Sequence, residues 1–530
     1  MLLGELINGL NLRPIADATP SLRICDLTED SRTVVPGSLF IARPGTKADG
    51  RRYITDAIQA GAVAVVVQAD QAKESTTTSP TSPLSTAASY LSQITGAAIL
   101  EAPDAALAGA LLAERFYRNP SSHLQLVGIT GTNGKSTTAH IIHRTLNALH
   151  HRTGLIGTVE IDDGVCLAPA EMTTPPATEI SRTLACMVEQ GCLAAAMEVS
   201  SHALDQRRAA ALAFKVAVFT NLTRDHLNYH KTMHAYAAAK RRLFDMLPEG
   251  GIAVVNAQDP AWPDMVRQTK ARVIRCAAAP AAGNAHPSDS DASARIISHT
   301  MAGMSLELTG PWGTLPVHTP LIGEHNAMNL LQAAVCMWAL GLSAPRWSAA
   351  LAAVGPPAGR LQGVNAHADE IAVFVDYAHT PDALENVLNA LRAVAGPRPI
   401  TIVFGAGGDK DQGKRPLMGR VAARLAHRVV VTSDNPRSES PRAIIAQILE
   451  GITGPPRDRV EVHPDRERAI HAAIAQATVG EIIIIAGKGH ETQQVSVDDH
   501  GRPVSRRFHD CEVARAALAA RRGGVGASRE

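Results

Sequence analysis

A glycine-rich segment, GITGTNGKSTT at residues 128–138, has the residue types to bind the phosphates of a nucleotide. It follows a short apolar run and precedes a stretch with helical spacing at residues 136–150, which is the order that a phosphate loop needs. Glycines let backbone N–H groups approach an anion, and the helix N-terminus adds partial positive charge. Lys135 could reach the outer phosphates, and the Ser136 hydroxyl could ligate Mg²⁺. ATP or GTP binding is therefore predicted, although Ile129 replaces the first glycine of the common motif.

Two carboxylates close apolar segments and could also do chemistry. Glu198 follows LAAAM and Asp376 ends IAVFVD, so each should lie where a buried strand gives way to a loop. Carboxylate oxygens suit Mg²⁺, and a carboxylate could also accept the hydroxyls of a ribose. By residue type alone, His226 favours a structural role and Lys240 favours a solvated helix surface. The phosphate loop by itself does not distinguish a kinase, a motor and a ligase.

The elements that must position these residues alternate between apolar runs and helical stretches. VAVFTNL, GIAVVNA, PITIVFGA, RVVVTSDNP and GEIIIIAGKG each end in a polar or glycine-rich segment. Such runs suit buried parallel strands whose carboxyl-terminal loops carry function. At about 100–200 residues per domain, the 530 residues predict roughly three or four α/β domains.

The overall composition excludes several functional classes. Lys plus Arg number 51 and Asp plus Glu number 50, a near-neutral balance that gives no sign of a nucleic-acid or membrane-surface partner. No apolar run reaches the roughly 18 residues of a membrane span, and the N-terminus lacks signal-peptide features. Seven scattered cysteines form no CxxC pair, which favours reduced thiols over disulfides or structural zinc. We therefore expect a cytoplasmic enzyme.

Three segments have the composition of loops or tails. Residues 73–89 and 277–294 are rich in small and polar residues and predict flexible surface insertions. Neither insertion need mark a domain boundary. The segment from Arg521 onward, RRGGVGASRE, predicts a disordered tail.

Several motifs resemble those of the Mur ligase family and of its relative, folylpolyglutamate synthase. The phosphate loop reads TGTNGKST, and it is followed in that family's order by MEVSSHAL, TNLTRDHLNYH, GEHNAMN, PPAGR and DYAHTPDAL. An N-terminal stretch, DSRTVVPGSLFIARPGTKADGRRYI, resembles the family's uridine-binding domain. The resemblance covers nearly the whole chain apart from the two insertions and the tail, so it is far more specific than any single motif.

This resemblance implies an α/β fold of three domains. A small N-terminal α/β domain at residues 1–120 would bind the UDP end of a precursor. A central domain at residues 121–355, with a parallel sheet like that of phosphate-loop ATPases, would bind ATP. A doubly wound, Rossmann-like domain at residues 356–530 would bring the amino acid and close over the site, which would exclude water.

The resemblance also implies a magnesium site and a modified lysine. Ser136, Glu198 and His226 would ligate the metal. Lys240, in YAAAKRRLF, matches a lysine that carries a carbamate in this family, and the carbamate would turn a cation into an anion beside the metal. The expected catalytic residues are Lys135, Glu198, His226 and Lys240.

ATP contacts are expected from the phosphate loop and from three later positions. Asn326 resembles an adenine-side contact, Arg360 a phosphate contact and Asp376 a ribose contact. The expected ATP-binding residues are Gly131, Thr132, Asn133, Gly134, Lys135, Ser136, Thr137, Asn326, Arg360 and Asp376.

Two further groups would bind the UDP-linked precursor. Contacts to its peptide and sugar are expected from Thr173, Thr174, Ser200, Gln206 and Arg208. Arg208 could hold a carboxylate through a bidentate fork. Uridine-side contacts are expected from Ser31, Thr46, Lys47 and Ala48.

The C-terminal part of the chain bears on which amino acid is added. SDNPRSE at residues 433–439 resembles the motif of family members that add meso-diaminopimelate, whose distal carboxylate and ammonium need both donors and an acid. The expected contacts are Lys410, Asp434, Asn435, Pro436, Arg437, Gly487 and Glu491. Lys410 stands where relatives usually carry arginine, so the charge is kept and the bidentate geometry is lost.

Together these motifs imply an ATP- and Mg²⁺-dependent ligase of peptidoglycan synthesis that acts as a monomer. It would add meso-diaminopimelate to the D-glutamate γ-carboxylate of UDP-N-acetylmuramoyl-L-alanyl-D-glutamate through an acyl phosphate. Two alternatives stay open: the same reaction with L-lysine, and an ATPase switch or transport module. Folylpolyglutamate synthase is disfavoured by the N-terminal domain and by the DNPR motif.

Overall fold

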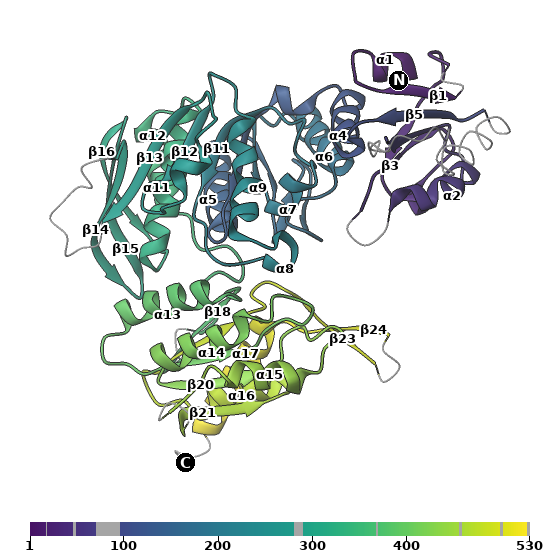
Figure 1. Ribbon diagram of the computed structural model, residues 1–530. Helices are drawn as coiled ribbons and strands as arrows, with labels where there is room; N and C mark the ends of the chain where they lie inside the picture. The colour runs from purple at the N-terminus through teal and green to yellow at the C-terminus, as the bar shows by residue number, and fades with distance from the viewer. Residues whose placement is uncertain are drawn as a thin grey trace.

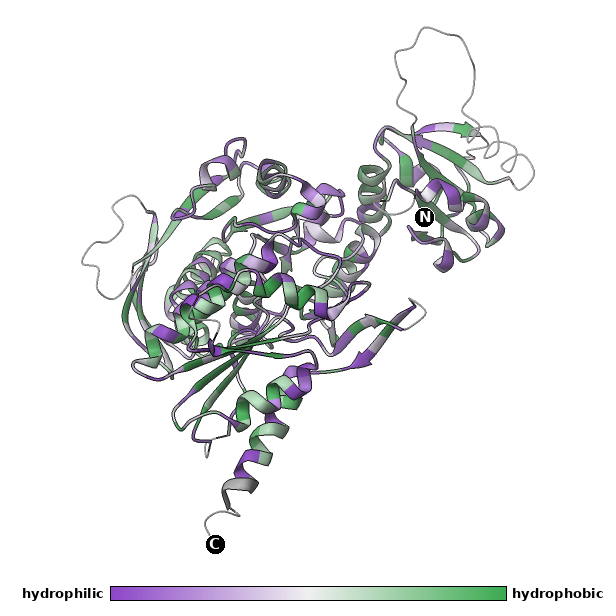
Figure 2. Ribbon diagram, turned by 60° about the horizontal axis from the view of Figure 1, so that its bottom comes forward, coloured by the Kyte–Doolittle hydropathy of each residue, from purple (hydrophilic) through white to green (hydrophobic). Residues whose placement is uncertain are grey.

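The computed structural model describes residues 1–16, 19–45, 49–69, 96–279, 290–366, 369–454, 458–498 and 502–526. They form three α/β bodies, each built on its own sheet, with the N-terminal body beside the central one and the C-terminal body below it (Figure 1). Apolar residues lie mainly on the inner strands and on the helix faces turned toward them (Figure 2). The predicted three-domain α/β fold is confirmed, whereas the domain boundaries stay predictions. In the described ranges, no helix combines the length and apolarity that crossing a membrane requires.

The N-terminal sheet carries helices on both faces. Its strand order is β1-β5-β4-β3-β2, with β1 antiparallel to β5 and the remaining neighbours parallel. Helices α1 and α4 pack on one face and α2 on the other, so every residue of β3 is buried. The bounds are α1 (Leu3–Ile7), β1 (Arg13–Ala16), β2 (Asp26–Thr28), β3 (Ser38–Ala42), α2 (Ile54–Gln59), β4 (Ala64–Gln68), β5 (Ala98–Ala102) and α4 (Ala105–Phe116), with 3₁₀ turns at Ser31–Thr33, Gly50–Tyr53 and Pro120–His123.

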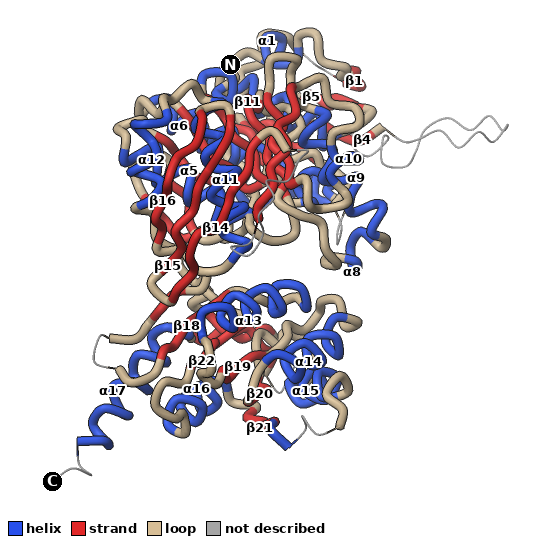
Figure 3. Tube along the Cα trace, turned by 90° about the vertical axis from the view of Figure 1, so that its left-hand side faces the viewer, coloured by secondary structure: helices blue, strands red, loops and turns tan. Residues whose placement is uncertain are grey.

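The central sheet has eleven strands in the order β16-β15-β14-β13-β12-β11-β6-β10-β7-β8-β9. Its middle is parallel, and antiparallel strands extend both edges, so the long β14, β15 and β16 form one side of the body (Figure 3). Helices α5, α11 and α12 cover one face, while α6, α7, α9 and α10 cover the other. The strand bounds are β6 (Gln125–Thr130), β7 (Thr153–Ile156), β8 (Glu160–Asp162), β9 (Leu167–Pro169), β10 (Ala194–Glu198), β11 (Phe214–Phe219), β12 (Ile252–Asn256), β13 (Arg272–Ala279), β14 (Ala292–Thr300), β15 (Gly303–Gly310) and β16 (Gly313–Thr319). The helix bounds are α5 (Lys135–Ala148), α6 (Ala177–Glu189), α7 (Ser201–Asp205), α8 (Leu227–His230), α9 (Met233–Asp245), α10 (Trp262–Met265), α11 (Glu324–Ala339) and α12 (Ala344–Ala352).

The C-terminal sheet is doubly wound, as predicted. Its order is β17-β18-β22-β19-β20-β21, parallel except at β17, with α13, α14 and α15 on one face and α16 and α17 on the other. A hairpin of β23 and β24 projects from this body (Figure 1). The bounds are β17 (Gln362–Gly363), β18 (Ala372–Asp376), α13 (Pro381–Ala395), β19 (Ile400–Phe404), α14 (Lys414–Leu425), β20 (Arg428–Thr432), α15 (Pro441–Leu449), β21 (Val460–His463), α16 (Arg466–Ala475), β22 (Ile482–Ala486), β23 (Gln493–Val497), β24 (Pro503–Arg507) and α17 (Asp510–Gly526).

Two loop predictions were too broad. The ends of the predicted insertion at residues 277–294 are strand, because β13 and β14 pair in parallel from Cys276 opposite Ala292 onward. The predicted disordered tail is helical through Gly526, and Arg521 donates to the Ile474 carbonyl at 2.7 Å, which ties α17 to the end of α16. The predicted insertion at residues 73–89 lies outside the described residues.

Candidate active site

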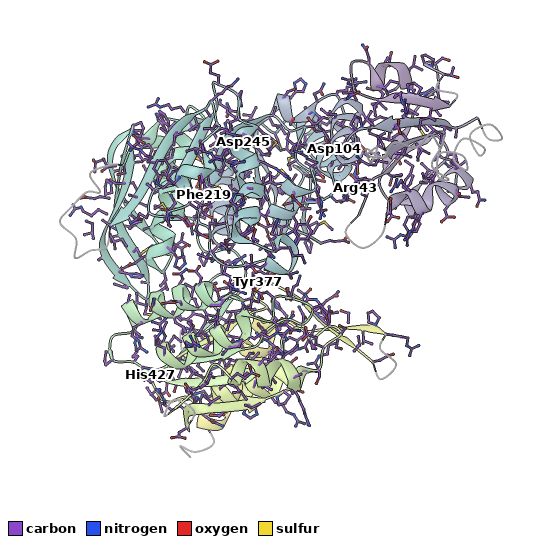
Figure 4. All side chains as sticks on the ribbon, in the orientation of Figure 1. Arg43, Asp104, Phe219, Asp245, Tyr377 and His427 are labelled. Carbon is purple, nitrogen blue, oxygen red and sulfur yellow. The ribbon has the colours of Figure 1, made fainter. Side chains whose placement is uncertain are left out.

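A cavity of about 570 Å³ lies between the central and C-terminal bodies. One wall consists of the phosphate loop and of residues at the carboxyl ends of β7, β10 and β11. The other wall consists of residues 356–361 and of the segment that joins β18 to α13. Parallel strands present these ends along one sheet edge, which explains why distant segments meet here. Tyr377, which lines the cavity, marks this junction in Figure 4.

The phosphate loop has the shape that its glycines predict. Gly131 and Gly134 have φ values of +153° and +87°, and a methyl group added at Gly131 would overlap Thr220 Oγ1. Lys135 Nζ donates to the Gly131 carbonyl at 2.9 Å, and burial lowers the pKa of this amine. The cavity wall includes the predicted residues Thr132, Asn133, Gly134, Lys135, Ser136 and Thr137.

Glu198 ends β10 and is almost fully buried, as its position after an apolar run predicted. Ser136 Oγ donates to Glu198 Oε2 at 2.9 Å, so the structure brings together two of the three predicted metal ligands. A carboxylate and a hydroxyl side by side suit Mg²⁺, which completes its shell with phosphate oxygens and water. Thr158 also binds this carboxylate: its backbone N–H donates to Oε1 at 2.7 Å and its hydroxyl to Oε2 at 3.0 Å. Sequence reasoning missed Thr158, whose signal was a Gly–Thr pair after a short apolar run.

His226 lines the same cavity and lies against a buried acid. Its Nε2 is 3.3 Å from Asp225 Oδ2, and desolvation lowers the pKa of the imidazole to about 3. A neutral imidazole can ligate a metal. Within the described ranges, however, no group of three or more His, Cys, Asp and Glu side chains is arranged to hold a metal ion. A magnesium ion here would therefore depend on the Ser136 hydroxyl and on substrate oxygens as well.

Lys240 is not the solvated helix lysine that its composition favoured. Its side chain is buried in α9, Nζ donates to the Gly131 carbonyl at 2.7 Å, and the Tyr236 ring lies 4.4 Å away. Burial, followed by the nearby Lys135 charge, lowers the pKa of Lys240 well below its usual value. A neutral amine is the form that can react with carbon dioxide, so the site suits the predicted carbamate.

The three later ATP-side residues all line the cavity. Arg360 Nη2 donates to Ser136 Oγ at 3.0 Å and its guanidinium stacks 4.8 Å from the Tyr377 ring. Asp376 accepts the Leu361 N–H at 2.7 Å, so this carboxylate holds the Arg360 segment as well as facing the cavity. Asn326 Nδ2 donates to the Ile322 carbonyl at 2.7 Å, at the start of α11.

The predicted precursor contacts gather beside Glu198. Thr174 Oγ1 donates to the Glu198 carbonyl at 2.8 Å, and Arg208 Nη1 donates to the Thr174 carbonyl at 2.7 Å. Thr173 shares a hydrogen bond with Thr158, Ser200 caps α7, and Gln206 accepts from Arg208.

The N-terminal body reaches the same region. Burial, followed by the Arg43 charge, lowers the pKa of the Arg208 guanidinium. Arg207 forms an ion pair with Asp104 at 3.4 Å. Figure 4 labels Arg43 and Asp104 on the side of the N-terminal body that faces the central one. Ser31 begins a 3₁₀ turn in this body. The predicted residues Thr46, Lys47 and Ala48 lie outside the described residues.

The predicted amino-acid residues come together from loops far apart in sequence. Asn435 Nδ2 donates to Glu491 Oε2 at 2.7 Å. Gly487 has a φ of +117°, and an added methyl group would overlap the Asp434 carboxylate. The remaining members of the predicted set are Lys410, Pro436 and Arg437. Arg437 Nη1 donates to the Gly408 carbonyl at 2.8 Å. Burial, together with the Arg437 charge, lowers the pKa of Lys410.

Direct contacts connect the phosphate loop to the C-terminal body. Asn133 Nδ2 donates to Asp382 Oδ2 at 2.7 Å, and Thr223 Oγ1 donates to the same oxygen at 3.3 Å. Arg224 pairs with Asp411 at 3.3 Å. Sequence reasoning missed Asp382: it lies within the DYAHTPDAL motif, in the first turn of α13, but no role was assigned to it.

Comparisons with known proteins agree along the chain. The Mur ligase family catalytic domain matches residues 24–117, the Mur ligase middle domain residues 129–337, and the Mur ligase glutamate ligase domain residues 359–489. A protein of Synechococcus elongatus named UDP-N-acetylmuramoyl-L-alanyl-D-glutamate–2,6-diaminopimelate ligase is 41% identical, with 97% of this chain and 99% of the relative covered. A protein of the same name from Pseudomonas aeruginosa is 41% identical, with 95% and 96% covered.

Solved structures give the same result. A structure titled as UDP-N-acetylmuramoyl-L-alanyl-D-glutamate–2,6-diaminopimelate ligase has a TM-score of 0.62 and 30% identity, with 95% of this chain and 96% of that chain covered. The MurF ligase of Thermotoga maritima in complex with ADP shares the fold, with a TM-score of 0.59, 16% identity and 94% and 98% coverage. With full-length relatives above 30% identity and all three family domains present, this chain belongs to the Mur ligase family.

Proposed function

We propose that this chain is an ATP-dependent ligase that adds meso-diaminopimelate to the D-glutamate γ-carboxylate of UDP-N-acetylmuramoyl-L-alanyl-D-glutamate, in peptidoglycan synthesis. The observation that carries the proposal is that the phosphate loop and the C-terminal body share one cavity, with Arg360 Nη2 3.0 Å from Ser136 Oγ. A transferable phosphoryl group, an acceptor carboxylate and an attacking amine could therefore meet in one place. Full-length relatives at about 41% identity carry the name of this activity.

The residues suggest how the first step would proceed. The precursor's γ-carboxylate attacks the γ-phosphorus of ATP, and the bond from that phosphorus to the β-phosphate oxygen breaks. ADP is the leaving group, and the precursor becomes an acyl phosphate. Lys135 and Arg360 lie where they could balance the charge on the transferring group, and phosphoryl transfer depends mainly on such positioning and electrostatics. Ser136 and Glu198 would hold Mg²⁺, which supplies charge neutralisation for the phosphates. A carbamate on Lys240 would add negative charge beside the phosphate loop.

The second step would need the C-terminal loops. The amine of diaminopimelate attacks the acyl carbon, and phosphate leaves from the tetrahedral intermediate, so ATP, acid and amine become ADP, phosphate and amide. The hydrogen-bonded pair Asn435 and Glu491 would hold the distal end of the amino acid. Contacts such as Asn133 to Asp382 keep the two bodies together over the reactive acyl phosphate.

The setting follows from the same substrates. ATP and a nucleotide-linked sugar peptide favour a cytoplasmic reaction. We further propose that the enzyme acts as a monomer.

The test is a product assay with purified protein, UDP-linked muramoyl dipeptide, ATP and Mg²⁺, in which meso-diaminopimelate and L-lysine compete. We expect mass spectrometry to find the diaminopimelate tripeptide, with one ADP and one phosphate formed per amide. Hydroxylamine should trap the acyl phosphate when the amino acid is left out. A lysine product would replace the proposed amino acid with the nearest alternative. ATP hydrolysis without any precursor would favour an ATPase module, and ADP release that depends on folate would favour folylpolyglutamate synthase.

A further inference from the structure

A buried lysine lies behind the proposed amino-acid pocket and was not among the residues that the motifs assigned. The Lys488 side chain has no exposed surface. Its Nζ donates to Asn435 Oδ1 at 3.1 Å, to Glu491 Oε2 at 2.9 Å and to the Gln493 carbonyl at 2.5 Å. An ammonium group has three N–H donors, so each of them is used by the protein. Lys488 therefore acts on a ligand only through the side chains that it holds.

These bonds fix the Asn435 side chain. Its Oδ1 also accepts the Val495 N–H at 3.0 Å, while Nδ2 donates to Glu491 Oε2 at 2.7 Å. Reversing the amide would turn the NH₂ group toward the ammonium of Lys488, which cannot accept a hydrogen bond. Because Oε2 of Glu491 is engaged by both neighbours, Asn435 can offer one remaining N–H and Glu491 its other oxygen. Lys488 and the Val495 N–H together set the orientation of the Asn435 amide, and Lys488 alone adds a charge beside Glu491.

Charge gives Lys488 a second effect. The nearby ionisable side chains include the cations Lys410 and Arg437 and the anions Asp434 and Glu491. Arg466 also lies near Asp434 and Glu491, but it is paired with Asp510 at 2.7 Å. The distal centre of diaminopimelate carries an ammonium and a carboxylate and is neutral as a whole, whereas the distal end of lysine is a cation. Lys488 balances the charge of Glu491, which would otherwise attract a bare ammonium more strongly in this partly buried place.

We propose that Lys488 is a positioning residue that makes this pocket prefer an amino acid with a zwitterionic distal end over one with a distal ammonium alone. The inference rests on the proposed function and deepens it. It assigns selectivity to a residue that donates no bond to the substrate, through the orientation of Asn435 and the charge balance of Glu491.

The experiment compares the full-length enzyme with Lys488→Met, measuring kcat and KM for meso-diaminopimelate and for L-lysine. We expect KM for diaminopimelate to rise about 30-fold, the size of effect seen when one partner of a buried charge pair is removed. KM for ATP should change little, and the ratio of lysine to diaminopimelate use should rise about tenfold. Lys488→Arg, which keeps the charge, should restore part of the preference. Lys270→Met, at an exposed lysine before β13, is the matched control and should behave as wild type.

Two further variants separate charge from packing. Gln494→Ala removes the 2.6 Å bond to the Asp434 carbonyl without changing charge, and it should weaken both amino acids equally. In Lys488→Met combined with Glu491→Gln, the ratio should return toward wild type because both charges are gone. If Lys488→Met does not fold, the double variant is compared with Glu491→Gln instead: loss of the Lys488 charge in that background should raise the lysine to diaminopimelate ratio.

The outcomes distinguish a failure of the Lys488 role from a failure of the proposed function. Equal losses for both amino acids in Lys488→Met, or the same ratio in the double variant as in Glu491→Gln, would overturn the role of Lys488 and leave the diaminopimelate ligase intact. A wild-type enzyme that adds neither amino acid would overturn the proposed function and this inference with it.

Discussion

The phosphate loop and the DNPR loop serve opposite ends of the proposed reaction and are built in opposite ways. The phosphate loop is one continuous segment in which glycines adopt the unusual backbone angles. In the DNPR loop a non-glycine residue, Arg437, has a positive φ of 51°, and its N–H donates to the Val495 carbonyl of another strand at 3.1 Å. Glycines permit the backbone angles of the phosphate loop, whereas in the DNPR loop a residue with a side chain is held in such an angle by its contacts.

This difference has a consequence for how each region should respond to mutation. Under the proposed function, changes in the phosphate loop would act directly on bound nucleotide. Changes around the DNPR loop act through supports such as Gln494 and Lys488, which come from a segment about sixty residues later. We therefore expect nucleotide-side variants to lose the chemical step, and amino-acid-side variants to lose affinity for one substrate.

The largest effect is expected from Lys135→Met. The variant removes the cation that the proposed function assigns to the transferring phosphoryl group, so kcat/KM should fall about 1000-fold or more, as expected for charged groups that stabilise phosphoryl transfer. The loss should be the same with every amino acid tested. A preserved rate of acyl phosphate trapping by hydroxylamine would contradict the assignment of the phosphate loop.

An acid titration should test the central body, in which His202 lies on α7. Desolvation lowers the pKa of His202 from 6.5 to about 4, so the folded protein binds fewer protons than the unfolded chain between these values. The contribution of His202 to stability is therefore present above about pH 6.5 and is lost as the pH falls toward 4, by up to about 3 kcal/mol. Urea unfolding as a function of pH measures this, and His202→Gln should flatten the slope in that window.

Gly487→Ala tests the other region. The added methyl group would overlap the Asp434 carboxylate, and alanine disfavours a φ of +117°. KM for diaminopimelate should rise about 30-fold, equivalent to roughly 2 kcal/mol, because the DNPR loop has to shift. ATP binding, measured by calorimetry, should stay at the wild-type value. A matching loss of ATP affinity would mean that the two regions are more tightly coupled than their contacts indicate.

The smallest effect is expected where the phosphate loop contacts α13 of the C-terminal body. Asp382→Ala removes the acceptor of Asn133 and Thr223 without touching either loop's own shape. Loss of such hydrogen bonds at a partly buried site should lower kcat/KM about fivefold, equivalent to about 1 kcal/mol. Acyl phosphate released into solution and hydrolysed should increase if the contact keeps the bodies closed. An unchanged ratio of ADP to amide would argue that the contact is incidental.

Much of this fold could be predicted from local patterns. Apolar runs such as RVVVT and EIIIIA became parallel strands because burial on both faces demands continuous apolar residues. Patterns of composition were less reliable at edges. Residues 277–279 and 292–294 have the small side chains of a loop but form strands, since a neighbouring strand supplies their hydrogen bonds.

The site divides in the same way. Ser136 and Glu198 could be predicted because a loop motif and a strand end each place one group at a known edge of a sheet. Thr158 and Asp382 could not, because a loop threonine and an aspartate in the first turn of a helix have many ordinary uses, and only the fold shows what each contacts. For Lys240, residue type alone favoured a solvated surface and the family resemblance implied a place at the metal site; the structure buries its amine beside the phosphate loop.

The sequence by itself determined the nucleotide loop, the strand and helix order and the family resemblance, because each depends on residues that are close together in the chain or on motifs in a set order. Only the tertiary structure decided which distant groups form ion pairs and hydrogen bonds with each other. Lys488 illustrates the physical reason: a lysine's pairing depends on which acids and carbonyls fold around it, and burial then makes that pairing obligatory.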